Sequence, residues 1–194
     1  MSSLVISGDT SGTVTLAAPA VAGTTTLTLQ AATATSSVNT LGTALAYNWN
    51  GLTTNTSLDF TALPSWIKRI TVMFNGVSTN STSNIIIQIG SGSYTISGYT
   101  SLAQYPSTPT TFTSGFGIVN SINSASTVSG ISQICLLGSN IYIQNGNMIT
   151  ASGVTFVSAG NSSALSGALD RIRITTVNGT DTFDAGSVNL LYEG

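Results

Sequence analysis

Residues 58–90 read LDFTALPSWIKRITVMFNGVSTNSTSNIIIQIG, and this stretch decides the fold. Successive side chains of a strand point to opposite faces, so Ile70, Val72 and Phe74 share one face of a predicted strand. Residues 85–89 are almost all isoleucine, which is typical of a strand that is covered on both faces. The linker between these strands is rich in Asn, Ser and Thr and predicts a turn. We therefore expect a β-hairpin, which must recruit further strands to build a core.

The composition predicts a β-rich globular chain with very few charges. The chain has 194 residues, of which 41% are hydrophobic and 5% are charged. Typical soluble domains have about a quarter of their residues charged. Hydrophobic residues are frequent enough for a core, and the Thr and Val residues favour strands. The length predicts one domain or at most two.

The low charge also limits the kinds of partner that we expect the chain to bind. The formal net charge is −2, and the four cations form two pairs, Lys68/Arg69 and Arg171/Arg173. This is too little positive charge to neutralise many phosphates, so we expect no nucleic-acid partner. A surface with few charges is poorly protected against association. The alternatives are a monomer with a Ser/Thr surface and a homo-oligomer, and we expect the homo-oligomer, as a trimer.

Many short strand and turn signals follow the opening stretch. Asn145-Gly146 is the strongest tight-turn signal in the chain and predicts a hairpin. Pro106 and Pro109 predict an exposed loop over residues 101–110. The fold class that we expect is all-β, an antiparallel β-sandwich or jelly roll with an extended N-terminal attachment segment.

Three regions are expected along the chain. Residues 1–40 form an N-terminal attachment and oligomerisation segment, with strands over residues 4–6, 13–16 and 24–29. Residues 41–58 form a connector, and residues 59–194 form the β-sandwich domain. The first region contains no aromatic residue and little charge, so its expected partners are copies of itself or another protein.

The sequence contains few side chains that are suited to catalysis or metal binding. There is no histidine, so no Ser-His-Asp, Cys-His or zinc arrangement is available. Asp181 and Asp184 raise the alternatives of a calcium site and of turn-capping side chains, and we favour turn capping. Asp59 and Asp170 could in principle form a glycosidase pair in which one carboxyl has a raised pKa, but nothing in the sequence brings them together. We expect no enzyme, no catalytic or metal-binding residue and no cofactor.

Cys135, the only cysteine, is expected to be a buried structural thiol. The sequence shows neither a secretory signal nor a run of apolar residues long enough for a membrane-spanning helix. We expect synthesis in a cytoplasm and no membrane insertion.

Tyr99 and Tyr105 are the candidate receptor-contact residues, because both lie in the aromatic-bearing stretch 97–109. Tyrosine offers a stacking face and a hydroxyl at a modest ordering cost. The alternative is that both residues pack at an end of the sandwich or at a trimer axis.

Three stretches resemble bacteriophage tail-fibre and related virion proteins. They are SGDTSGTVTLAAPAVAGTTTLTL (7–29), DFTALPSWIKRITVMFNGVS (59–78) and GTDTFDAGSVNLLYE (179–193). The resemblance implies a structural virion protein of a tailed phage, located in the virion after synthesis in the bacterial cytoplasm. A tail fibre is the first expectation, and a capsid decoration or head fibre is an alternative. The resemblance further implies attachment to other virion proteins through the N-terminal segment and contact of the distal domain with a host glycan or protein.

A free carbohydrate-binding module and a glycan-cleaving enzyme remain alternatives.

Deleting residues 1–40 is expected to leave a folded β-domain that no longer enters virus particles, because attachment is assigned to this segment. Circular dichroism and quantification of the truncated chain in purified particles check this expectation. Incorporation at the normal copy number would contradict the assignment.

Overall fold

The computed structural model describes residues 3–7, 13–17, 45–48, 55–105 and 108–194. All the regular elements in these ranges are β-strands, and every strand pairing is antiparallel. The chain divides into a unit of residues 1–36 and a unit of residues 37–194. The expected all-β fold class is confirmed.

In the first unit, the described residues form one strand pair. β1 (Ser3–Ser7) pairs with β2 (Thr13–Ala17), and Leu4 lies opposite Leu16. The strands expected at residues 4–6 and 13–16 are thus present, whereas the strand expected at 24–29 lies outside the described residues.

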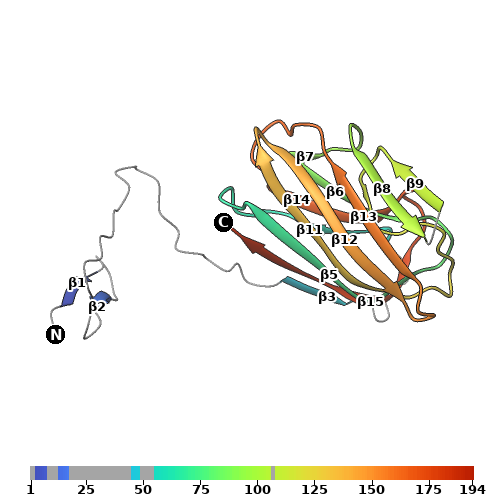
Figure 1. The fold of residues 1–194 in the computed structure, drawn as a ribbon, viewed down its shortest axis with the longest axis horizontal. Coiled ribbons are helices and arrows are strands. Elements are labelled where there is room, and N and C mark those ends of the chain that lie inside the picture. The colour runs from blue at the N-terminus through green and yellow to red at the C-terminus, as the bar shows by residue number, and fades with distance from the viewer. Residues whose placement is uncertain (1–2, 8–12, 18–44, 49–54, 106–107) are drawn as a thin grey trace. The chain divides into compact units, whose positions relative to one another are not determined.

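The second unit is a sandwich of two sheets (Figure 1). The larger sheet has eight strands in the order β3–β15–β5–β11–β12–β13–β8–β9, and the smaller sheet has the order β10–β6–β14–β4, with β7 paired to β6. The larger sheet consists of β3 (Leu45–Asn48), β5 (Arg69–Thr79), β8 (Thr100–Tyr105), β9 (Thr108–Phe112), β11 (Val128–Gly138), β12 (Ile141–Thr150), β13 (Thr155–Asn161) and β15 (Phe183–Glu193). The smaller sheet consists of β4 (Ser57–Phe60), β6 (Ile85–Ser91), β7 (Ser93–Tyr94), β10 (Phe116–Gly117) and β14 (Arg171–Thr176).

The two strands of the opening stretch belong to opposite sheets, so the expected hairpin is wrong. β5 pairs with β11 and β15, whereas β6 pairs with β10 and β14. The reason is the burial of β6 on both faces. Ile85, Ile87 and Ile89 face the core, and Ile86 packs on the other side against Ala103 and Phe112.

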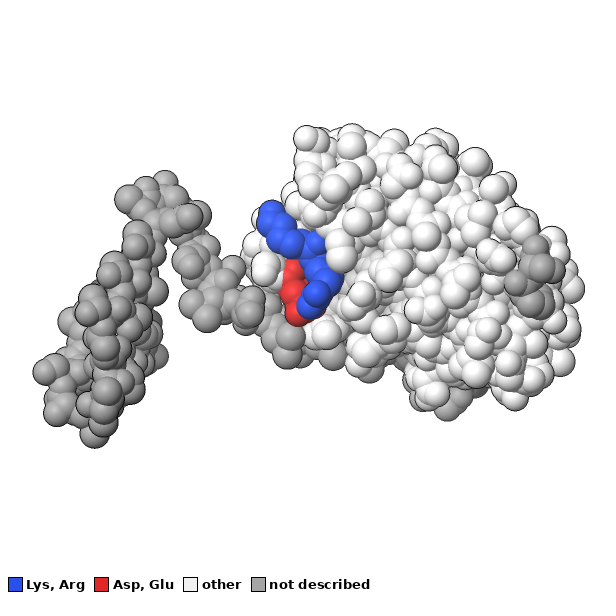
Figure 2. Space-filling model, viewed as in Figure 1, with Lys and Arg blue, Asp and Glu red and all other residues white. Residues whose placement is uncertain are grey.

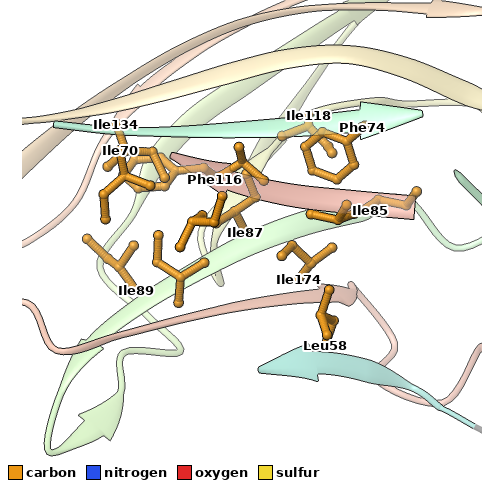
Figure 3. Close-up of a cluster of buried hydrophobic side chains, with 14 of the residues drawn as sticks. Leu58, Ile70, Phe74, Ile85, Ile87, Ile89, Phe116, Ile118, Ile134 and Ile174 are labelled. Atoms are coloured by element: carbon orange, nitrogen blue, oxygen red, sulfur yellow. The ribbon is translucent and has the colours of Figure 1, made fainter. Parts of the chain in front are cut away.

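The core lies between the two sheets. Ile70, Phe74 and Ile134 of the larger sheet meet Ile87 and Phe116 of the smaller one (Figure 3). The alternation read from the sequence is confirmed here, since Ile70 and Val72 are fully buried and Phe74 is 4% exposed. Burying such side chains stabilises the fold by roughly 1.5–3 kcal/mol each.

The Asn145-Gly146 hairpin is also wrong. Both residues lie in the middle of β12, paired on one side to β11 and on the other to β13. The turn between β11 and β12 is instead made by Ser139 and Asn140, whose φ angles are 50° and 59°. Two consecutive positive φ values are what a tight hairpin turn requires, and Asn tolerates them well.

Gly146 has a packing role in β12. The side chain of Gln144, which is 4% exposed, lies so close that a Cβ atom on Gly146 would come within 3.1 Å of its Nε2. That nitrogen donates to Ser132 Oγ at 2.9 Å and to Ser158 Oγ at 2.8 Å. The three strands β11, β12 and β13 are therefore joined by a buried polar bridge on their inner faces.

The connector expected over residues 41–58 contributes to both sheets. β3 pairs with β15, and β4, which begins at Ser57, pairs with β14. The sandwich therefore draws on strands that precede residue 59.

Replacing Ile87 with alanine should lower the free energy of unfolding by about 2–5 kcal/mol, because the side chain is fully buried between the sheets. Urea denaturation measures this loss. Ile96→Ala is the matched control, since Ile96 is 65% exposed and its loss should change stability little. Equal effects of the two substitutions would contradict the core described here.

Candidate interaction surface

The larger sheet turns one face away from the core, and β12 shows this most clearly. Ile143, Asn145, Asn147 and Ile149 are exposed, while the residues between them are buried. Ile143 is 44% exposed and Ile149 is 46% exposed. Two adjacent amides are thus flanked by two large aliphatic side chains along the exposed side of a central strand.

The neighbouring strands extend this pattern. Ile131 of β11 and Val157 of β13 both pair with Asn147, and they are 45% and 53% exposed. We define the central outer face as the outward-facing side chains of β11, β12 and β13 at Ser129, Ile131, Gln133, Cys135, Ile143, Asn145, Asn147, Ile149, Thr155, Val157 and Ala159. All of them are uncharged.

Cys135 belongs to this face, so the expectation of a buried thiol is wrong. It pairs with Ile143 on β12 and with Arg69 on β5, and it is partly exposed. The core position is taken by its neighbour Ile134, because alternate residues of a strand point to opposite sides.

Charge lies at the margin of the larger sheet. Figure 2 shows the charged residues of one face gathered in a single patch near the C-terminus, while the other described residues in view are uncharged. On β5 and β15, the paired residues Arg69 and Glu193 form a bidentate ion pair with N–O distances of 2.6 and 2.8 Å. The hydrogen bond from Arg69 lowers the pKa of Glu193, and the same bond raises the pKa of Arg69. The pair holds the two strand ends in register.

The other two arginines lie on the smaller sheet around Tyr94. Arg173 forms a bidentate pair with Asp59 at 2.7 and 2.6 Å, and Arg171 pairs with Asp170 at 2.7 Å. The guanidinium carbons of Arg173 and Arg171 lie 4.2 and 5.7 Å from the ring centroid of Tyr94. Burial, followed by the charge of Asp59, raises the pKa of Tyr94. These contacts join β4, β7 and β14.

Asp59 and Asp170 therefore each have an arginine partner. The hydrogen bond from Arg171 lowers the pKa of Asp170. A glycosidase general acid needs a raised pKa instead. The arrangement gives no support to a carboxylate pair for glycan cleavage.

Asp181 caps a turn, as the favoured interpretation expected. Its Oδ1 accepts a hydrogen bond from Asn178 Nδ2 at 2.6 Å, and its Oδ2 accepts one from the Ser83 amide at 2.9 Å. Asp184 lies three residues further on, where β15 departs from regular register with β5. Within the described ranges, no cluster of three His, Cys, Asp or Glu residues has the arrangement of a metal site.

Tyr99 is 2% exposed, so it is not accessible to a receptor. Its hydroxyl donates to the Thr95 carbonyl at 3.0 Å and accepts from the Ile89 amide at 3.0 Å. Its ring meets Phe116 edge-on, with centroids 5.0 Å apart. Burial raises the pKa of Tyr99 to about 12. Tyr99 therefore ties the segment before β8 to the smaller sheet.

Tyr105 is partly exposed and lies at the end of β8. Its ring packs against Phe156 with centroids 5.4 Å apart. The expected exposed loop is in fact the β8–β9 hairpin, in which Tyr105 pairs with Thr108. Pro109 is compatible with β9 because this strand is the edge of the sheet. Residues 106 and 107 lie outside the described residues.

The exposed aliphatic residues of β12 were missed at the sequence level because Asn145-Gly146 was interpreted as a turn. The sequence itself carries no period-two pattern here, because both faces of β12 mix apolar and polar side chains, and the alternation of residues 141–150 is visible only in their burial.

Among the described residues, no helix has the length and hydropathy needed to cross a membrane. Comparison with known proteins found no matching family model, no similar curated protein and no similar solved structure.

Raising the pH from 10 to about 12 should reduce the free energy of unfolding, because Tyr99 stays neutral in the folded chain and ionises in the unfolded one. A raised pKa contributes stability below the ordinary value of 10, and this contribution is lost as the pH approaches about 12. Two pKa units correspond to roughly 3 kcal/mol.

Urea denaturation across this pH range measures the effect. Tyr99→Phe is the matched variant: it should be less stable at neutral pH, having lost its hydroxyl bonds, but should show a weaker dependence on alkaline pH. An unchanged pH dependence in this variant would contradict the assignment to Tyr99.

Proposed function

We propose that this chain is a structural virion protein of a tailed bacteriophage, a short tail fibre whose β-sandwich associates with copies of itself. The observation that carries the self-association is the central outer face, which exposes Ile131, Ile143, Ile149 and Val157 without any charged side chain. Obligate interfaces are apolar and depleted in charge. The virion assignment is supported by the sequence resemblance described above.

A second copy of the same chain fits this face for two reasons. An uncharged face meets its own copy without like-charge repulsion. The amides of Asn145 and Asn147 both donate and accept hydrogen bonds, so they are complementary to themselves. Three copies can direct this face toward a common axis. The strand ends that carry the Arg69–Glu193 ion pair then lie outside the interface of the trimer.

The double variant Ile143→Asp/Ile149→Asp should dissociate the oligomer, because it places like charges in the proposed interface. Light scattering should give the mass of three copies for the unmodified chain and of one copy for the variant. Val177→Asp is the control, because Val177 is 49% exposed and lies after β14 of the smaller sheet.

A monomeric unmodified chain at micromolar concentration would overturn the self-association, and a dimer would replace the threefold arrangement. The same double variant should enter phage particles at reduced copy number. Absence of the unmodified chain from purified particles would overturn the virion assignment.

A further inference from the structure

Two adjoining clefts lie at one end of the sandwich. They are bordered by the segment 118–127 before β11 and by the turn 151–154 between β12 and β13, and their volumes are about 210 and 130 Å³. Both clefts are lined by Asn123, Ser126, Thr150 and Ser152. We call the two together the hydroxyl cleft.

The walls of the hydroxyl cleft are fixed by buried contacts. Asn120 is fully buried, and its Nδ2 donates to the Thr108 carbonyl at 2.9 Å, which anchors the segment 118–127 to β9. The Ala151 amide donates to the Thr127 carbonyl at 3.3 Å, which joins the two walls. Groups held in place in this way lose little freedom on binding a ligand.

The polar atoms of the cleft keep hydrogen-bonding capacity. Thr150 Oγ1 and Ser152 Oγ share one hydrogen bond at 2.9 Å, and Thr150 Oγ1 also accepts one from the Val154 amide at 3.2 Å. The remaining capacity therefore lies on the Ser152 hydroxyl, since a hydroxyl can donate once and accept twice. Asn123 Oδ1 accepts from the Ala125 amide at 2.9 Å, and within the described ranges its Nδ2 makes no hydrogen bond. Asn123 and Ser152 are both exposed, so these atoms are open to solvent.

One wall of the cleft is aromatic. Tyr105 and Phe156 both line it, and their rings pack together at an interplanar angle of 31°. The cleft therefore combines an aromatic surface with several hydroxyl groups and an amide.

We propose that the hydroxyl cleft binds a neutral saccharide. Sugar hydroxyls donate and accept, as the Ser, Thr and Asn groups here do, and the apolar face of a sugar ring packs on an aromatic side chain. None of the residues lining the two clefts is charged, which disfavours phosphate, carboxylate and cationic ligands. The volumes are below the ~300–1,000 Å³ of pockets for drug-sized ligands, which suits one or two sugar rings.

This inference rests on the proposed function only in making the saccharide a component of the host surface. Tyr105, rather than Tyr99, is then the tyrosine of the stretch 97–109 that contacts the ligand. Saccharide binding itself can be measured on the purified full chain and does not depend on the oligomeric state.

Saturation-transfer NMR with methyl glycosides of glucose, galactose, mannose and N-acetylglucosamine tests the proposal on the full chain. At least one glycoside should give a saturable signal in the millimolar range. Asn123→Ala and Ser152→Ala should each weaken its affinity by about tenfold, the usual effect of losing one hydrogen bond. Ser163→Ala is the matched control, because Ser163 is exposed and follows β13 at the opposite end of that strand.

Three results would overturn the proposal: no saturable signal with any of the four glycosides, equal affinity in the cleft variants and the unmodified chain, or tighter binding of a sialylated or phosphorylated sugar. The melting temperature of each variant shows whether it is folded. Light scattering on the same samples reports the self-association separately, so a failure of one proposal is distinguishable from a failure of the other.

Discussion

The burial of β6 on both faces is the constraint on which the rest of the sandwich depends. A strand with isoleucine at positions 85, 86, 87 and 89 must be covered on the core side and on the opposite side. The core side is supplied by the larger sheet. The opposite side needs cover as well, and the β8–β9 hairpin supplies it through Ala103 and Phe112. The larger sheet therefore extends beyond β13 so that its last hairpin reaches the far side of the smaller sheet.

This constraint also explains which parts of the fold could be predicted from the sequence. The alternation of Ile70, Val72 and Phe74 gave a correct strand face, because that pattern depends only on local geometry. The pairing partners of β5 and β6 could not be read in the same way. A turn-rich linker joins strands equally well within one sheet or between two, and the choice depends on strands that lie far away in the sequence.

The central outer face and the hydroxyl cleft were harder to predict from the sequence than the fold. Asn145-Gly146 is a turn signal in isolation, yet Gly146 lies inside β12, where a Cβ atom would come within 3.1 Å of Gln144 Nε2. A turn at Asn145-Gly146 would split β12 into two short strands, so that Ile143 and Ile149 are not recognised as neighbours on one exposed face. Tyr99 and Tyr105 look equivalent in sequence, and only the packing of Tyr99 against Phe116 separates a buried residue from an accessible one. The hydroxyl cleft is formed by β8, the segment before β11 and the β12–β13 turn. Because these elements are far apart in the sequence, no local pattern predicts that they meet.

The buried amide of Gln144 has a consequence for the alignment of the larger sheet. A slip of β12 by two residues keeps every side chain on its own side of the sheet, so hydrophobic alternation does not oppose it. A slip that moves Gln144 two residues further from Ser132 and Ser158 would separate its amide from both hydroxyls and leave three polar side chains without these partners in the interior. It would also move the gap at Gly146 out of line with both serines. The Gln144 side chain thus helps to fix the register of β11, β12 and β13, which the apolar residues alone would leave open to more than one alignment.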